Sequence, residues 1–147
     1  GGRVARLRPP HWPAYPPAAH FEHGATAAAE ANAALIGADC AAIGLDVVCA
    51  PCLDLRLPGA HGVIGDRAFS ADPAEVSRLG AAWVRGLQSA GCIPVTKHIP
   101  GHGRALVDSH ESLPRVEATA TELAADIAPF RDLAGCGAWA MTAHILY

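Results

Sequence analysis

The chain has 147 residues, of which 51% are hydrophobic and 17% are charged, and its formal net charge is −3. This length and composition indicate a soluble globular chain of about one domain. With no basic cluster interleaved with aromatic residues, nucleic acid is not an expected partner, and no apolar run approaches the roughly 20 residues that a membrane-spanning helix needs.

Arginine and proline dominate the first 17 positions, which favours an extended loop over a helix. The sequence begins Gly-Gly-Arg without Met and stops at Tyr147 directly after an apolar run, so we expect both ends to be cut. The Ala-rich stretch 25–42 predicts a first helix that ends before Gly44. Residues 45–50 (LDVVCA) predict a short strand that is covered on both faces.

The second helix is predicted to begin after Asp72, where an N-cap residue, a first-turn proline and Glu75 occur together. Apolar residues then recur at helical spacing to about residue 90, and Gly91 is the expected stop. Residues 92–96 predict a second buried strand.

A capping-box pattern, Thr119 to Glu122, predicts the start of a third helix. We expect Pro129 to kink or restart this helix. Residues 138–143 (AWAMTA) then predict a third strand, which is followed by His144.

Strands that alternate with helices are typical of repeated βα units and a parallel sheet. Ionisable residues follow all three predicted strands: Asp54, Lys97, His98 and His144. In α/β proteins, functional sites are built at the carboxyl ends of parallel strands. A complete (β/α)8 barrel needs about 250 residues, so this chain would supply roughly the middle strands of a single barrel domain.

Residues 97–110 (KHIPGHGRALVDSH) form the densest polar segment. Lys97 and His98 could donate to sugar hydroxyls, phosphates or carboxylates. His110 is either a proton donor and acceptor tuned by Asp108 or a solvated loop histidine. We expect Gly101 and Gly103 to give this segment freedom to move.

Two other kinds of chemistry are weaker interpretations of the same segment. His98 and His102 lie four residues apart across a Pro-Gly pair, so they cannot share a helix face as a metal pair does, and we expect no metal or cofactor. Ser109 lacks a nucleophile elbow. The five cysteines, odd in number and mostly in apolar segments, indicate buried free thiols in a reducing compartment.

Two arginines outside this segment are further candidates for the site. Arg67 stands in a Gly-rich loop on the same expected face as Lys97, although it could be only a helix-flanking charge. Arg6 could be a solvated loop charge, or the N-terminal loop could fold over the site.

The segment KHIPGHGRALVDSH followed by LP resembles the signature of family 3 glycoside hydrolases, in particular the bacterial β-N-acetylhexosaminidases of peptidoglycan recycling. Further matches occur in the family's order along the whole chain: GGRVARLRPP, CAPCLDL, VIGDRAFSADP, PF in the third helix and MTAHILY. The resemblance implies a (β/α)8 barrel and a retaining mechanism through a covalent glycosyl-enzyme intermediate.

By motif position, the resemblance assigns the acid/base to His110, on a mobile loop, and its tuning carboxylate to Asp108. Sugar contacts fall to Arg6, Arg67, Lys97 and His98. The implied substrate is a muropeptide with terminal N-acetylglucosamine, handled by a cytoplasmic enzyme that we expect to be a monomer.

The family's nucleophile, an Asp in a Ser-Asp-Asp-like motif, does not occur before Tyr147, and neither does its substrate-binding Asp before Gly-Gly-Arg. We therefore expect this chain to be inactive alone. A family 3 β-glucosidase and a non-catalytic sugar-binding relative remain the alternatives.

Overall fold

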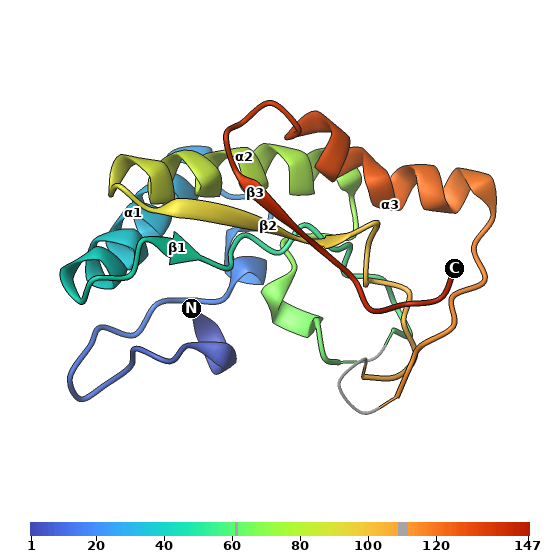
Figure 1. Ribbon diagram of the computed structural model, residues 1–147, viewed down its shortest axis with the longest axis horizontal. Coiled ribbons are helices and arrows are strands. Elements are labelled where there is room, and N and C mark those ends of the chain that lie inside the picture. The colour runs from blue at the N-terminus through green and yellow to red at the C-terminus, as the bar shows by residue number, and fades with distance from the viewer. Residues whose placement is uncertain (61, 109–111) are drawn as a thin grey trace.

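A computed structural model describes residues 1–60, 62–108 and 112–147 (Figure 1). Helices and strands alternate along the chain: α1 (Thr26–Ala42), β1 (Val47–Val48), α2 (Pro73–Ser89), β2 (Ile93–Ile99), α3 (Ala120–Asp132) and β3 (Trp139–Thr142). Short 3₁₀ turns occur at Gly2–Val4, Ala18–Phe21 and Gly65–Arg67. The predicted order of elements is confirmed, although the N-terminal loop contains a helical turn.

The three strands form one parallel sheet in the order β1-β2-β3. Val47 pairs with Ile93, and Val95 pairs with Trp139. Strands that follow one another in space as they do in sequence are joined by crossovers of one hand, which places the connecting helices on one face. Figure 1 shows α2 and α3 together on the same side of β2. The predicted α/β class with a parallel sheet is confirmed.

Small residues on α1 allow it to lie close against α2. Ala29, Ala33, Gly37 and Cys40 are its buried positions. On α2, a Cβ at Gly86 would lie only 2.2 Å from the Glu30 carbonyl oxygen. The alanines that give this segment helix propensity therefore also set the distance between the two helices.

An aromatic cluster fills the core beneath the strand ends. The rings of Phe21 and Trp83 meet edge to face at 5.6 Å between centroids, and those of Phe69 and Trp83 meet at 5.4 Å. Phe69 is fully buried. This cluster gives rigid support to the loop after β1, because Phe69 lies two residues beyond Arg67.

The predicted helix starts are confirmed in atomic detail. The Asp72 side chain accepts a hydrogen bond from the Ala74 N–H at 2.9 Å, and Thr119 and Glu122 form a reciprocal capping box. The prediction that Pro129 restarts α3 is wrong, because one helix continues through it to Asp132. Pro129 is fully buried within that helix.

Two strand predictions need correction. The first strand is not covered on both faces, because Leu45 and Val47 are 46% and 39% exposed and so lack packing partners on one face among the described residues. The second strand runs three residues further than predicted, to Ile99, because its pairing with β3 continues past Lys97 to Thr142.

Over the described parts of the chain, every helix is too short or too polar to cross a membrane.

Candidate active site

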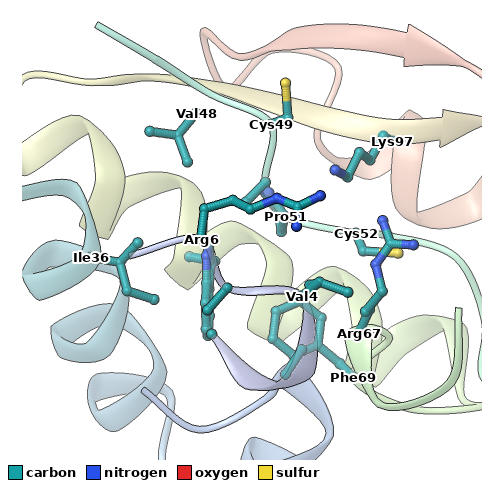
Figure 2. A pocket seen from close by; sticks show the side chains of 15 residues that line it. Val4, Arg6, Ile36, Val48, Cys49, Pro51, Cys52, Arg67, Phe69 and Lys97 are labelled. Carbon is teal, nitrogen blue, oxygen red and sulfur yellow. The ribbon is translucent and has the colours of Figure 1, made fainter. Parts of the chain in front are cut away.

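Three basic side chains from distant parts of the sequence line one cavity of about 560 Å³. Arg6 comes from the N-terminal loop, Arg67 from the loop after β1, and Lys97 from β2. Figure 2 shows the three side chains extending toward the space between these segments. All three were predicted from the sequence as sugar contacts, a role that stays a prediction, and the N-terminal loop borders the cavity.

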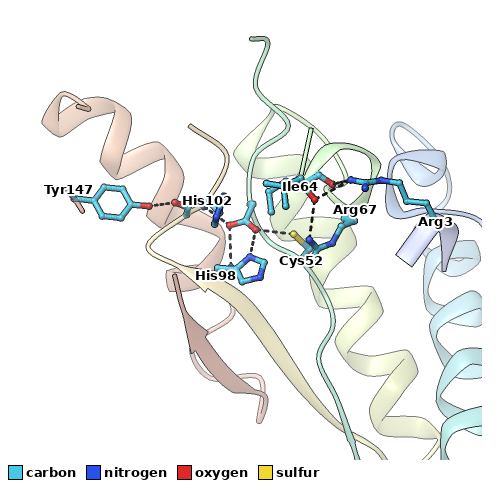
Figure 3. Close-up of polar contacts among 10 residues, drawn as sticks. Arg3, Cys52, Ile64, Arg67, His98, His102 and Tyr147 are labelled. Carbon is cyan, nitrogen blue, oxygen red and sulfur yellow. Dashed lines mark hydrogen bonds and ion pairs between the residues drawn. The ribbon is translucent and has the colours of Figure 1, made fainter. Parts of the chain in front are cut away.

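Arg3 fixes the loop that carries Arg67. Its guanidinium donates to the carbonyl oxygens of Gly62 at 2.6 Å and Val63 at 3.1 Å, and it pairs with Asp66 at 3.2 Å (Figure 3). Arg67 itself donates to the Val63 carbonyl oxygen at 3.1 Å. The sequence offered no sign that Arg3 is more than a loop charge, because its partners lie about 60 positions away.

Lys97 is half-buried near the carboxyl end of β2. Burial lowers the pKa of its amine, and the positive charge of Arg67 lowers it further. Lys97 borders the large cavity, whereas His98 lines a second cavity of about 190 Å³ with Arg67 and His144.

Asp54 was predicted to lie at the end of a strand, but the sequence assigned it no role in the site. Its carboxylate is 1% exposed and lies 2.7 Å from His98 Nδ1. It also accepts from the backbone N–H groups of His98 at 3.2 Å and His102 at 2.6 Å, and from the Cys52 thiol at 3.0 Å. Burial alone would raise the pKa of this carboxyl, but the donors around it, His98 first, hold the pKa below its usual value.

The glycines after β2 are required by close packing. Gly101 and Gly103 are buried, and a Cβ at Gly103 would lie 2.2 Å from the Leu55 carbonyl oxygen. Gly101 adopts φ +143° and packs against Asp126. The close approach of other atoms therefore explains why both positions are glycine, and the predicted freedom of movement stays a prediction.

Asp108 is half-exposed and borders neither cavity, but its charge is close enough to raise the pKa of His102 against the larger lowering effect of burial. His110, the predicted acid/base, lies outside the described residues. The structure thus brings together four of the six predicted site residues around two adjoining cavities: Arg6, Arg67, Lys97 and His98.

One group within the described ranges has the side chains to ligate a metal: Cys52, Asp54 and His98, whose ligand atoms lie within 4.8 Å of one another. These three side chains are already linked by hydrogen bonds, because the Cys52 thiol and the His98 imidazole both contact Asp54 Oδ2. The cationic Arg67 and Lys97 nearby also oppose a further positive charge. These cationic donors therefore suit an organic ligand that carries hydrogen-bond acceptors.

The whole chain, residues 1–147, matches the family model described as glycosyl hydrolase family 3 N terminal domain. It is 45% identical over 115 residues to a protein named Beta-hexosaminidase from Alkalilimnicola ehrlichii, and that match covers 77% of this chain and 33% of the relative. A Beta-hexosaminidase from Methylococcus capsulatus is 40% identical over 100% of this chain and 45% of its own length.

Among solved structures, the chain is similar to NagZ from Neisseria gonorrhoeae in complex with N-trifluoroacetyl-D-glucosamine. The two share 36% sequence identity and a TM-score of 0.88, and the match covers 100% of this chain and 46% of that chain. The present chain thus spans between a third and a half of the length of these proteins.

Proposed function

The chain belongs to glycosyl hydrolase family 3, and from that premise we propose that it forms the sugar-binding and acid/base part of a retaining β-N-acetylhexosaminidase. The observation that carries this proposal is the convergence of Arg67, Lys97 and His98 around two adjoining cavities at the carboxyl ends of β1 and β2. The 45% identity to a protein named Beta-hexosaminidase supports the activity.

The sheet order supports a finer proposal about the fold. Three parallel strands in sequential order, with helices gathered on one side, match an arc of a (β/α)8 barrel better than a doubly wound sheet, which places helices on both faces. We propose that residues 1–147 are part of a single barrel domain, completed by strands beside β1 and β3.

In the proposed reaction, Arg67, Lys97 and His98 hold the hydroxyl groups of a terminal N-acetylglucosamine. His110 protonates the leaving oxygen and then, as a base, activates water, while Asp108 tunes its pKa. An imidazole that titrates near neutrality suits both steps.

A retaining enzyme also needs a nucleophile, and the family's Ser-Asp-Asp-like motif that would supply it does not occur in residues 1–147. We propose that it belongs to a longer protein, in keeping with relatives two to three times as long as the chain. The further proposals of a muropeptide substrate, a cytoplasmic location and a monomeric state follow from the family resemblance.

The test compares two substrates and two proteins. The complete protein should hydrolyse an aryl N-acetyl-β-glucosaminide much faster than the matching aryl β-glucoside, and the 147-residue chain should hydrolyse neither. Preference for the glucoside would favour a β-glucosidase, and no turnover of either by the complete protein would favour a sugar-binding relative. Turnover by the 147-residue chain would contradict the need for an outside nucleophile.

A further inference from the structure

The Asp54 carboxylate receives four hydrogen bonds, two on each oxygen. The backbone N–H groups of His98 and His102 donate to Oδ1, while Cys52 Sγ and His98 Nδ1 contact Oδ2. Asp54 lies on the loop after β1, and His98 lies on the neighbouring strand β2. Figure 3 shows the His98 ring, the Cys52 thiol and His102 close together, and its dashed lines include their contacts with Asp54.

These contacts decide where the hydrogen atoms lie. An ionised carboxylate only accepts, and it has about four lone-pair positions, so four contacts at 2.6 to 3.2 Å fill it completely. His98 Nδ1, at 2.7 Å from Oδ2, must therefore carry a hydrogen in either protonation state of the ring. Nε2 is then the nitrogen left for a ligand.

We propose that Asp54 is a positioning residue that fixes the tautomer and ring orientation of His98, so that Nε2 is presented to the sugar. The part of this inference that names a sugar rests on the proposed function. The tautomer itself follows from the geometry of the described residues alone.

The fixed tautomer also defines what the site recognises. A neutral His98 offers an acceptor at Nε2 beside Arg67 and Lys97, which offer only donors. A hydroxyl group can donate to Nε2 and accept from a cation at the same time. A carboxylate or phosphate group can only accept, so it would leave Nε2 without a donor. The site thus favours a polyhydroxy ligand over an anion.

The first test needs no substrate. Long-range ¹H–¹⁵N NMR of the histidine rings in the full chain, with His98 assigned from a His98→Gln variant, reports which ring nitrogen carries the hydrogen. We expect the hydrogen on Nδ1. A neutral His98 with its hydrogen on Nε2 and a bare Nδ1 would overturn the inference, even if no Asp54 variant folds.

The second test is the Asp54→Asn variant, whose amide oxygen has two lone pairs for four donors. We expect the His98 ring to lose its fixed Nδ1–H signal. Asp126→Asn is the matched control, because Asp126 is also buried, at 3% exposure, but its carboxylate is held by Arg104. Both variants should lose stability, and only Asp54→Asn should change the His98 spectrum. An unchanged His98 spectrum in Asp54→Asn would refute the role.

The third test uses kinetics in the complete protein. Asp54→Asn should raise KM for the aryl N-acetyl-β-glucosaminide by about 10- to 100-fold, as loss of a partner behind a ligating histidine does, with a smaller effect on kcat. In a His98→Gln background the same change should leave KM unaltered. A purely structural role would instead lower kcat through a smaller active fraction and give the same loss in both backgrounds. Failure of the proposed function would appear as absent turnover with the NMR result intact.

Discussion

Lys97 carries a positive charge into a half-buried position. Within the described residues, no hydrogen bond or ion pair compensates its amine, and both burial and Arg67 lower its pKa. A charge held without a partner costs stability, and a structure retains it where a ligand supplies the missing contact. Lys97 is thus the residue at which binding and stability oppose each other most directly.

Lys97→Met should stabilise the free chain by about 1 kcal/mol, since an apolar group of similar length replaces an unpaired charge. Urea unfolding measures this change. Because the pKa of Lys97 is lowered in the folded chain, the unfolded chain binds this proton more tightly. The unaltered chain should therefore gain stability relative to Lys97→Met as the pH rises from the lowered pKa toward the ordinary value of 10.5.

The control is Arg85→Met, which removes a cation that is already paired with Glu30 on the exposed side of α2. This variant should show no gain in stability and no such pH dependence. If Lys97→Met destabilised the chain at neutral pH, the amine would have a favourable partner, contrary to this account.

Individual site residues differed in how well the sequence revealed them. Arg67, Lys97 and His98 could be identified because each follows a strand or lies in a motif that resembles the family. The role of Asp54 could not, because its partner His98 is 44 positions away and the contact exists only once β1 and β2 lie side by side. The catalytic roles of the half-exposed Asp108 and of His110, which lies outside the described residues, remain predictions.

At the scale of the elements, α3 begins at a capping box that satisfies two otherwise free backbone N–H groups. The Thr119 hydroxyl accepts from the Glu122 N–H at 3.2 Å, and the Glu122 carboxylate accepts from the Thr119 N–H at 2.9 Å. Thr119→Ala should cost about 1 kcal/mol of unfolding free energy, measured by urea titration.

Thr121→Ala, two residues along the same helix at an exposed position, is the comparison. It should be neutral or slightly stabilising, because alanine is the better helix former. Equal losses in both variants would show that the cap contributes nothing specific.

The contact between α1 and α2 depends on the missing side chain at Gly86. A Cβ there would lie 2.2 Å from the Glu30 carbonyl oxygen and 2.8 Å from the Ala33 Cβ. Gly86→Ala should therefore destabilise the chain by about 2 kcal/mol despite its better helix propensity, because the helices must separate.

Thermal unfolding of Gly86→Ala beside Gly135→Ala gives the comparison. A Cβ at Gly135 would meet no atom within 4 Å, so that variant should unfold close to the temperature of the unaltered chain. An unaltered melting temperature for Gly86→Ala would mean that the two helices are not packed as described.

Local signals explain why the helices were easier to predict than the strands. The helix caps at Asp72 and Thr119 each depend on residues within four positions of one another, whereas the length of β2 depends on its pairing with β3. Pro129 breaks the hydrogen-bonding pattern that a helix needs, but its complete burial in the packed α3 outweighs that local preference.

At the scale of the whole molecule, the site is made by bringing together the ends of adjacent parallel strands. Trp139 on β3 is 58% exposed and Val47 on β1 is 39% exposed, so both outer strands of the sheet present apolar side chains. Among the described strands, β1 and β3 also each pair with β2 alone, so each has an edge that can pair with a further strand, as the proposed barrel requires. The class of fold could be predicted from the alternation of elements, but strand exposure could not, because it depends on what lies beside the outer strands.

The most direct test of the central claim, that this arrangement serves proton transfer to a sugar leaving group, is the leaving-group dependence of a His110→Ala variant of the complete protein. The variant should lose about 100- to 10,000-fold in kcat/KM on N-acetyl-β-glucosaminides with poorly acidic leaving groups. On activated aryl substrates, which need little proton donation, the loss should be far smaller. Equal losses on both classes of substrate would contradict the account.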